Sequence, residues 1–328
     1  MAQAWTLKSR PQGTPTLDNF ELVGIELPAL EPGMVRLANR WLSVDPYMRG
    51  RMNDVKSYVP PFAIGEPLQG GAIGEVVESS ADGLKAGDLV LHMAGWRDEA
   101  VLPASAVQKL PELGVPPEAY LGQMGMPGMT AYFGLLEVAS AKEGDVVFVS
   151  AAAGAVGSTV VQIAKAKGMK VIGAAGGADK CAWVKGLGAD AVIDYKAGPV
   201  IKQLMDVAPG GIDVYFDNVG GDHLDAALAT AKERARFAIC GMIEMYNTGA
   251  PTQLRYAARI IGARLRIQGF IVSDYMARAP EFYRDMAGWA QAGKLKREET
   301  VLEGLARTPD AFLGLFSGGN TGKMLVRV

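Results

Sequence analysis

The segment that most restricts the fold of this chain is a short apolar run followed by a glycine-containing loop and a helix. Residues 146–150 read Val-Val-Phe-Val-Ser, residues 151–157 read Ala-Ala-Ala-Gly-Ala-Val-Gly, and a helical pattern continues to Lys167. Small residues let the backbone turn sharply and approach a pyrophosphate, which the helix N-terminus attracts. Ala152 stands where the full dinucleotide fingerprint has its first glycine. We interpret the segment as a dinucleotide-binding loop, with an ordinary tight strand-to-helix turn as the alternative.

The sequence beyond this loop alternates between predicted helices and strands. Gly168 ends the first helix, and strands are expected at residues 170–174, 191–195, 212–217, 236–241 and 265–270, each preceded by a helix. A last helix is expected at residues 280–292, before Gly293. This alternation is typical of a doubly wound parallel sheet, the Rossmann fold.

The sequence before the loop shows a different pattern of apolar runs and turn residues. Residues 1 to about 125 contain short apolar runs separated by turn signals such as Glu31-Pro32-Gly33, a pattern typical of a mostly antiparallel β domain. Residues 300–303 and 323–328 are strand-like again. We therefore expect two domains in an α/β protein: residues 1–125, completed by about 300–328, and residues 126–299.

Composition favours small-molecule chemistry. Lys and Arg total 33 against 35 acidic residues, so the chain has no large field with which to bind nucleic acid or a membrane surface. No apolar stretch approaches the roughly 20 residues that span a bilayer. Cys181 and Cys240 each lie in an apolar segment, which favours free thiols in a reducing compartment. We expect a cytoplasmic protein.

The choice of dinucleotide can be argued from the second strand of the predicted sheet. An acid at its end normally binds both ribose hydroxyls and selects NAD, but here the strand runs into Gly176 and Gly177, and Lys180 follows. Asp179 is expected to cap the next helix. The pattern predicts NADP(H), with a solvated helix lysine as the other interpretation of Lys180.

A candidate catalytic residue follows a later strand. Residues 240–247 read Cys-Gly-Met-Ile-Glu-Met-Tyr-Asn and leave the carboxyl end of a predicted strand, where doubly wound sheets place ligands. The Tyr246 phenol could donate a hydrogen bond to a carbonyl oxygen that becomes an enolate. A tyrosine packed at a domain interface is an equally open alternative. His92 and His223 are expected to be structural.

Six separated segments together resemble the zinc-independent medium-chain dehydrogenase/reductases. Within that family they resemble the prostaglandin and leukotriene reductases, the 2-alkenal double-bond reductases and the bacterial curcumin reductases. The segments are residues 42–49, 125–132, 151–157, 216–221, 240–247 and 320–323, and the resemblance covers essentially the whole chain. It implies a GroES-like, mostly β catalytic domain, a Rossmann NADP-binding domain, and a homodimer.

The resemblance also implies roles for individual residues. Tyr246 would be catalytic, Tyr47 would border the substrate, and Lys180 and Tyr195 would hold the 2′-phosphate. The cofactor is further expected to contact Met126, Thr130, Ala153, Gly154, Ala155, Val156, Asn218, Cys240, Gly241, Met242, Ile243, Tyr246, Phe270, Ile271, Val272 and Asn320. Zinc-dependent relatives carry a Gly-His-Glu motif near residues 68–75, where this chain has no histidine, so no metal site is expected.

The expected reaction is hydride transfer from NADPH to the β-carbon of an α,β-unsaturated aldehyde or ketone. Quinone reduction on the same scaffold is an alternative within enzymes, and an NADPH-binding protein without catalysis is an alternative outside them. The physiological substrate is not predicted, because the loops at residues 51–62 and 273–279 carry no recognisable signature.

Overall fold

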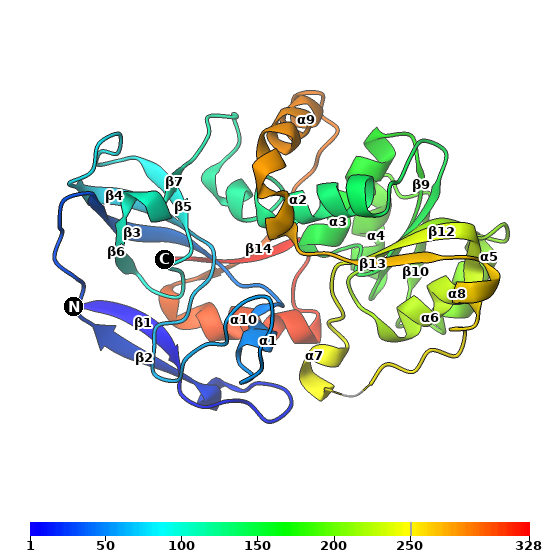
Figure 1. The fold of residues 1–328 in the computed structure, drawn as a ribbon, viewed down its shortest axis with the longest axis horizontal. Helices are drawn as coiled ribbons and strands as arrows, with labels where there is room; N and C mark the ends of the chain where they lie inside the picture. Colours follow the sequence, from blue (N-terminus) through cyan, green and yellow to red (C-terminus); the bar gives the residue numbers. More distant parts are fainter. Residues whose placement is uncertain (250) are drawn as a thin grey trace. The chain divides into compact units, whose positions relative to one another are not determined.

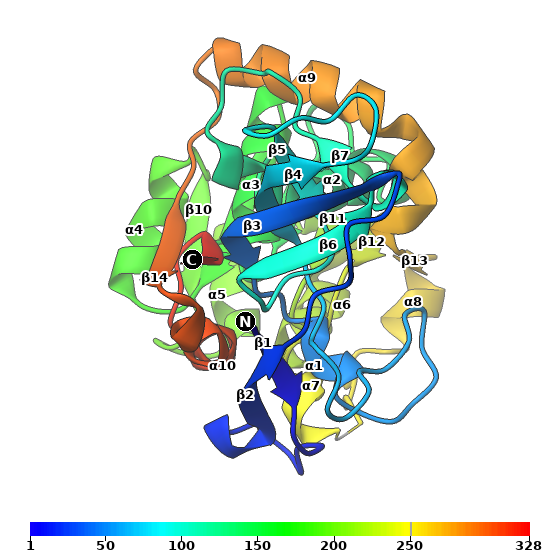
Figure 2. The same ribbon diagram turned by 90° about the vertical axis from the view of Figure 1, so that its left-hand side faces the viewer.

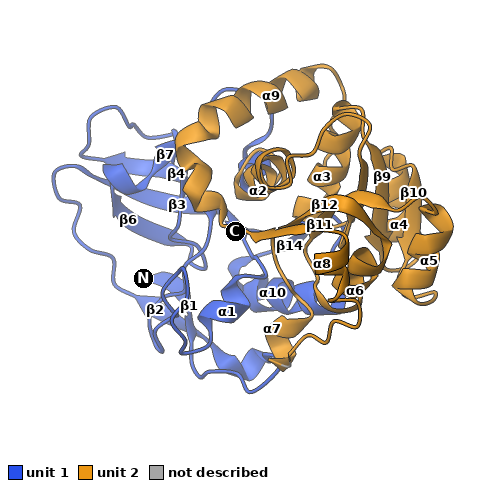
Figure 3. Ribbon diagram, turned by 45° about the vertical axis from the view of Figure 1, so that its right-hand side comes forward, with its two compact units in different colours: residues 1–121, 299–328 blue, residues 122–298 orange. Residues whose placement is uncertain are grey.

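The computed structural model describes residues 1–249 and 251–328 (Figure 1). The chain divides into two compact units (Figure 3). Unit 1 comprises Met1–Leu121 and Glu299–Val328, and unit 2 comprises Gly122–Glu298. Unit 1 is thus built from both ends of the chain. Among the helices of the described residues, none is both long and apolar enough to cross a membrane.

Unit 2 contains a sheet of six parallel strands. They are β8 (Val146–Val149), β9 (Lys170–Ala175), β10 (Ala191–Asp194), β11 (Ile212–Asp217), β12 (Ala231–Ile239) and β13 (Arg266–Gly269). Their order across the sheet is β10-β9-β8-β11-β12-β13. Numbered from the first strand, this is the order 3-2-1-4-5-6 of the doubly wound dinucleotide-binding fold, so the predicted Rossmann sheet is confirmed.

Helices connect these strands and flank the first and last of them. They are α2 (Met126–Phe133), which continues into the π turn η4 (Gly134–Val138), α3 (Ala155–Ala166), α4 (Ala178–Gly186), α5 (Val200–Val207), α6 (Gly221–Thr230), α7 (Met245–Thr248), α8 (Arg259–Gly262), the 3-10 segment η5 (Val272–Arg278) and α9 (Ala279–Gln291). The central strands are apolar because helices cover both faces of a parallel sheet. Phe148 stacks on Tyr215 at 5.1 Å between ring centroids, and Tyr215 meets the edge of Phe237 at 5.4 Å.

Two sequence-based details of unit 2 were wrong. The strand expected at residues 236–241 begins at Ala231, directly after α6, because the polar residues 232–234 hide the start of β12 from an apolar pattern. Asp179 is not the N-cap of α4. Gly177 takes that position with a φ of 95°, which glycine adopts without strain, and Asp179 lies in the first helical turn.

Unit 1 is mostly β-structure, as predicted (Figure 2). Its main sheet has the order β14-β15-β3-β4-β5-β7, with β6 also paired to β3, and β1 pairs with β2 in a separate ribbon. The strands are β1 (Ala2–Leu7), β2 (Phe20–Ile25), β3 (Met34–Ser43), β4 (Ala72–Ser79), β5 (Leu89–His92), β6 (Glu99–Pro103), β7 (Gln108–Lys109), β14 (Glu299–Glu303) and β15 (Lys323–Arg327). Neighbouring strands are antiparallel except β14 and β15.

Short helices complete unit 1. They are η1 (Leu17–Asn19), α1 (Met48–Arg51), η2 (Ala104–Ala106), η3 (Pro117–Leu121), η6 (Leu305–Arg307) and α10 (Thr308–Ser317). The sequence analysis did not predict α10, although Pro309 at its start and the left-handed Gly318 at its end are ordinary helix signals. Phe312 of α10 packs edge-on against Phe20 and Trp96 in the unit 1 core.

Candidate cofactor-binding and active site

One edge of the unit 2 sheet collects the segments that were singled out from the sequence. Parallel strands end at the same edge, so the residues that follow them come together there. Ala153, Gly154, Ala155 and Val156 follow β8, Lys180 follows β9, Tyr195 follows β10, Asn218 follows β11, Cys240, Gly241, Met242 and Ile243 follow β12, and Phe270, Ile271 and Val272 follow β13. Met126 and Thr130 lie in α2, which packs against α3.

The loop between β8 and α3 is too tight for larger side chains. A Cβ on Gly157 would lie 2.3 Å from the Ala151 carbonyl oxygen, and a Cβ on Gly173 would lie 2.9 Å from the Cβ of Ala152. The left-handed position of the turn falls on Ala151, whose φ is 47°, and not on Ala152. The Ala152 amide instead donates to the Ala174 carbonyl at 2.8 Å and ties the loop to β9.

This loop fits a dinucleotide pyrophosphate. Gly154 is the N-cap of α3, and the first turn of this 12-residue helix contains no acidic residue. The first amides of a helix lack partners within it, and together with the helix dipole they attract an anion. The small residues at positions 151–157 leave the backbone accessible to such a group.

A second corner of the edge fits a phosphate monoester. Burial, and then the charge of Lys196, lower the pKa of the Lys180 ammonium, so the two cations lie close enough to interact. Tyr195 packs over the backbone of Gly176, where a Cβ would lie 2.4 Å from the phenol oxygen. Two neighbouring cations beside a phenol suit a dianion. Lys196 was missed from the sequence, although it adjoins Tyr195 at the end of a predicted strand.

The Asp194 carboxylate at this corner already accepts hydrogen bonds from the backbone. Asp194 accepts hydrogen bonds from the amides of Gly177 and Lys196, both at 2.9 Å. These two amides lower the pKa of the Asp194 carboxyl. The acid therefore closes the turn after β9, and the strand β9 itself ends without one.

Asp217 holds the neighbouring loops together beneath the edge. Its side chain is fully buried and accepts from the Tyr215 hydroxyl at 2.7 Å and the Gly220 amide at 2.8 Å. Burial raises the pKa of the carboxyl against these donors. The Asp217 carbonyl accepts from the amides of Cys240 and Gly241, which joins the loops after β11 and β12. Asn218 is fixed in turn, because its side chain donates to the Ser150 carbonyl at 2.8 Å.

Tyr246 lies half-buried in the single helical turn α7, after the loop that leaves β12. Its hydroxyl oxygen accepts a long hydrogen bond from the Met242 amide at 3.4 Å. A Cβ on Gly241 would lie 3.0 Å from that oxygen, so glycine permits the close approach. A phenol whose oxygen accepts a hydrogen bond is polarised toward donating its own proton.

Tyr47 and Asn320 belong to unit 1. Burial, and then the carboxylate of Asp45, raise the pKa of the Tyr47 phenol, which stays neutral and able to donate. The loop that follows is anchored by Arg51, which donates to the Pro60 carbonyl at 2.9 Å and to the Gln69 side chain at 2.8 Å. The Asn320 side chain donates to the Gly322 carbonyl at 2.8 Å and shapes its own turn.

The residues that most often bind metals are dispersed. Within residues 1–249 and 251–328, no group of three or more His, Cys, Asp or Glu side chains is arranged to hold a metal ion. His92 and His223 are buried, and burial lowers the pKa of each to about 4. Burial, with the charge of Asp217, raises the pKa of Cys240 to about 12.

Two family models match the chain. Residues 3–110 match the N-terminal domain of oxidoreductases, and residues 155–291 match the zinc-binding dehydrogenases. The chain is 42% identical to the NADPH-dependent curcumin reductase of Escherichia coli, over 99% of this chain and 96% of the relative. It is 40% identical to prostaglandin reductase 1 of Bos taurus, over 99% of both. It is also 40% identical to an NADP(+)-dependent 2-alkenal reductase of Nicotiana tabacum, over 98% of this chain and 96% of the relative.

Solved structures agree with these relatives. The crystal structure of CurA from Vibrio vulnificus in complex with NADPH superimposes with a TM-score of 0.95 and 43% identity, covering 100% of this chain and 99% of that one. The Escherichia coli quinone oxidoreductase in complex with NADPH is similar with a TM-score of 0.80 and 22% identity, over 99% of this chain and 100% of that one. At that identity the similarity shows the shared fold alone.

Proposed function

We propose that this chain, which belongs to the medium-chain dehydrogenase/reductases, is an NADPH-dependent enzyme that reduces the carbon-carbon double bond of α,β-unsaturated aldehydes and ketones. Within that family it belongs to the branch of the curcumin, prostaglandin and 2-alkenal reductases. The observation that carries this proposal is whole-length identity of 40 to 42% to those reductases. The edge of the unit 2 sheet supports it, because its loop and cations fit an NADP dinucleotide. Quinone reduction is less well supported, since the quinone oxidoreductase resembles the chain only in fold.

The cofactor is held by unit 2 in this proposal. The amides at the start of α3 bind the pyrophosphate, and Lys180, Tyr195 and Lys196 bind the 2′-phosphate. The contacts along the rest of the dinucleotide are expected from Met126, Thr130, Asn218, the segments 240–243 and 270–272, and Asn320. Bound NADPH supplies the hydride.

Tyr246 activates the substrate in this proposal. Its phenol donates a hydrogen bond to the substrate carbonyl, which makes the β-carbon electrophilic and stabilises the enolate that forms. The Met242 amide keeps the phenol oxygen in position. Tyr47 borders the substrate and, as a neutral phenol, orients it.

The reaction is tested by incubating the enzyme with NADPH and a trans-enone and identifying the product. We expect NADPH oxidation with formation of the saturated ketone. Formation of the allylic alcohol would overturn the assignment of the reaction. A parallel assay with quinones as the faster substrates would favour the quinone reductase instead, and binding of NADPH without turnover of any acceptor would favour a protein without catalysis.

Lys180→Ala should weaken NADPH binding by about 1.5 to 3 kcal/mol, because a charge-assisted hydrogen bond to the 2′-phosphate is lost. NADH affinity should hardly change, since NADH lacks that phosphate. Dissociation constants from fluorescence titration check this. Lys185→Ala in the same helix is the matched control, because its ammonium donates to the Asp190 carbonyl at 2.7 Å. Equal losses for NADH and NADPH would refute the assignment.

We propose that catalysis needs no zinc, because the chain has only two histidines and two cysteines, which are too few for the usual sets of zinc ligands. His92 is also committed to structure, since its Nδ1 accepts from the Ala94 amide at 3.1 Å. Exhaustive chelation should leave kcat and KM unchanged. Stoichiometric zinc whose removal abolishes turnover would contradict this.

We propose a homodimer that joins two copies through β13. This strand ends the six-stranded sheet, and all four of its residues are exposed, which leaves one row of backbone groups available for pairing. Sedimentation equilibrium should give the mass of two chains. Ile267→Lys on β13 should shift the mass toward one chain, whereas Val207→Lys on the exposed side of α5 should not. A parent protein with the mass of one chain would refute the dimer.

We place the enzyme in the cytoplasm. Cys181 and Cys240 are both free thiols in the described structure, and burial raises the pKa of each. Free, unreactive cysteines are typical of proteins from a reducing compartment.

A further inference from the structure

A basic hollow lies at the edge of unit 2 opposite the proposed cofactor site. It has a volume of about 370 Å³ and is lined by Ser140, Lys142, Arg234, Arg236, Arg264 and Arg266. Arg234 and Arg236 lie within β12, Arg264 and Arg266 lie just before and at the start of β13, and Ser140 and Lys142 precede β8. The dinucleotide segments follow the other ends of these strands. The hollow and the proposed cofactor site are therefore separate.

The four arginines form two Arg-x-Arg repeats on neighbouring parallel strands. Arg234 and Arg236 belong to β12, and Arg264 and Arg266 flank the start of β13. Arg236 and Arg266 lie directly beside each other in the register of the two strands. Like charges at this spacing repel, so the bare arrangement is unfavourable.

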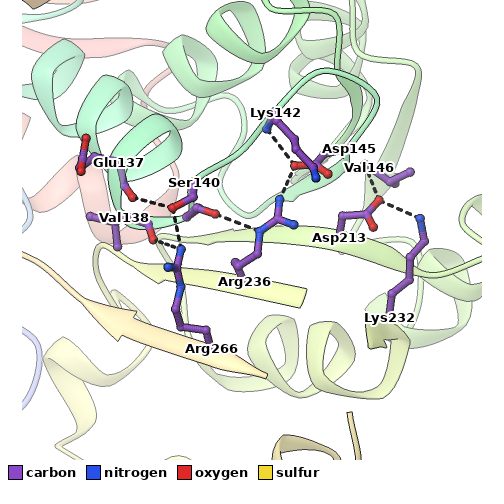
Figure 4. A network of polar contacts seen from close by, with 11 residues as sticks. Glu137, Val138, Ser140, Lys142, Asp145, Val146, Asp213, Lys232, Arg236 and Arg266 are labelled. Carbon is purple, nitrogen blue, oxygen red and sulfur yellow. Dashed lines mark hydrogen bonds and ion pairs between the residues drawn. The ribbon is translucent and has the colours of Figure 1, made fainter. Parts of the chain in front are cut away.

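Neighbouring carbonyls hold two of these arginines in place (Figure 4). The Arg236 guanidinium donates to the Ala139 carbonyl at 3.1 Å and pairs with the buried carboxylate of Asp145. The Arg266 guanidinium donates to the Val138 carbonyl at 2.7 Å and to the Ser140 hydroxyl at 2.9 Å. A guanidinium has five N–H donors, and these contacts use only some of them.

Acidic side chains neutralise only part of the charge. Asp145 pairs with Arg236, and Glu233 pairs with Arg264. Within the part of the chain that the structure describes, no carboxylate forms an ion pair with Lys142, Arg234 or Arg266. The hollow thus keeps three uncompensated cations around one open space.

The backbone of the hollow is also unusual. Within residues 1–249 and 251–328, five non-glycine residues have a positive φ, and three of them line the hollow. These three are Ser140, Arg234 and Arg264, with φ of 47°, 60° and 51°. Side chains with a Cβ rarely adopt this conformation, and such residues concentrate at functional sites. At Arg234 the conformation is supported by its amide, which donates to the Ala263 carbonyl at 2.7 Å.

We propose that this hollow is a second anion site, which binds a small molecule carrying two adjacent phosphate groups. Arginine forks match phosphate oxygens with paired hydrogen bonds, and a diphosphate supplies enough negative charge for three uncompensated cations. The cationic side chains that line the hollow suit an anionic ligand and not an apolar one. The ligand removes the repulsion between the facing arginines, so binding should also stabilise unit 2.

The test is isothermal titration of the full-length protein with inorganic pyrophosphate, at fixed ionic strength and with NADP+ saturating the dinucleotide site. We expect one pyrophosphate per chain. The variant Lys142→Gln with Arg234→Asn should bind it at least about tenfold more weakly, the change in affinity that one lost charged contact produces. Asparagine tolerates a positive φ and neither cation has a carboxylate partner, so this variant should fold.

Arg284→Asn is the matched control, since it removes an exposed arginine of α9 outside the hollow. It should bind pyrophosphate as tightly as the parent. Absence of binding to the parent, or equal binding to the parent and to the double variant, would overturn the proposal. Sedimentation of each protein distinguishes a lost site from a changed assembly.

Discussion

Tyr246→Phe is expected to lower kcat about 10-fold to 1,000-fold, the upper end being the loss typical of one oxyanion donor. The substitution keeps the aromatic ring and its packing in α7 but removes the hydroxyl. The NADPH dissociation constant should change little, because the substitution removes only the hydroxyl, which in this proposal faces the substrate carbonyl. Steady-state kinetics with an enone and fluorescence titration with NADPH measure the two quantities.

The control for Tyr246→Phe is Tyr256→Phe, which removes a phenol of the same unit that is 38% exposed. It should leave kcat unchanged. The Tyr246 hydroxyl also accepts from the Met242 amide, so a purely structural role would loosen the loop and weaken NADPH binding as much as it lowers kcat. An unimpaired Tyr246 variant would remove this residue from the mechanism while the proposed reaction stands.

Lys323→Met is expected to destabilise unit 1 by about 3 to 5 kcal/mol, because it leaves a buried carboxylate without its partner. The Lys323 ammonium donates to Asp45 at 2.9 Å and to the Val44 carbonyl at 2.8 Å, with both charged side chains less than a tenth exposed. Ser43 donates to the other oxygen of Asp45 at 2.5 Å. Urea unfolding followed by tryptophan fluorescence measures the loss.

Arg327→Met is the matched control for Lys323→Met, since Arg327 lies on the same strand and pairs with Glu303 at 2.9 Å. Both members of that pair are more than half exposed, so its loss should cost less than about 1 kcal/mol. Asp45→Leu added to Lys323→Met should recover much of the stability, because no buried charge remains unpaired. Equal effects of Lys323→Met and Arg327→Met would contradict the explanation.

The doubly wound sheet of unit 2 could be anticipated because the signals of its strands and helices are local. The apolar run of β8, the small residues before α3 and the stop at Gly168 lie within some twenty consecutive residues, and each carries information about its own element. Once the strands are parallel, the residues that follow them must share one edge. The common location of Lys180, Tyr195 and Asn218 therefore follows from sequence, while their contacts with a cofactor stay predictions.

Several parts of the site could not be anticipated from local patterns. Lys196 looks like any exposed lysine until the fold brings it near Lys180, and Asp194 looks like a possible ribose ligand until the amides of Gly177 and Lys196 occupy it. The start of β12 was hidden because its first residues are polar. For Lys196 and Asp194, a contact with another element, at Lys180 or Gly177, decides the role.

The sequence alone predicts a mostly β part and a doubly wound part, and it predicts which segments reach the carboxyl edge of the sheet, because side-chain periodicity and turn residues act over a few neighbouring residues. The packing of distant elements, in contrast, brings Lys323 to Asp45 and gathers two Arg-x-Arg repeats at one hollow. Asp45 and Lys323 are 278 residues apart, and Lys142 and Arg264 come from different connections of the sheet. Such pairings arise from the packing of whole elements, which no local pattern records.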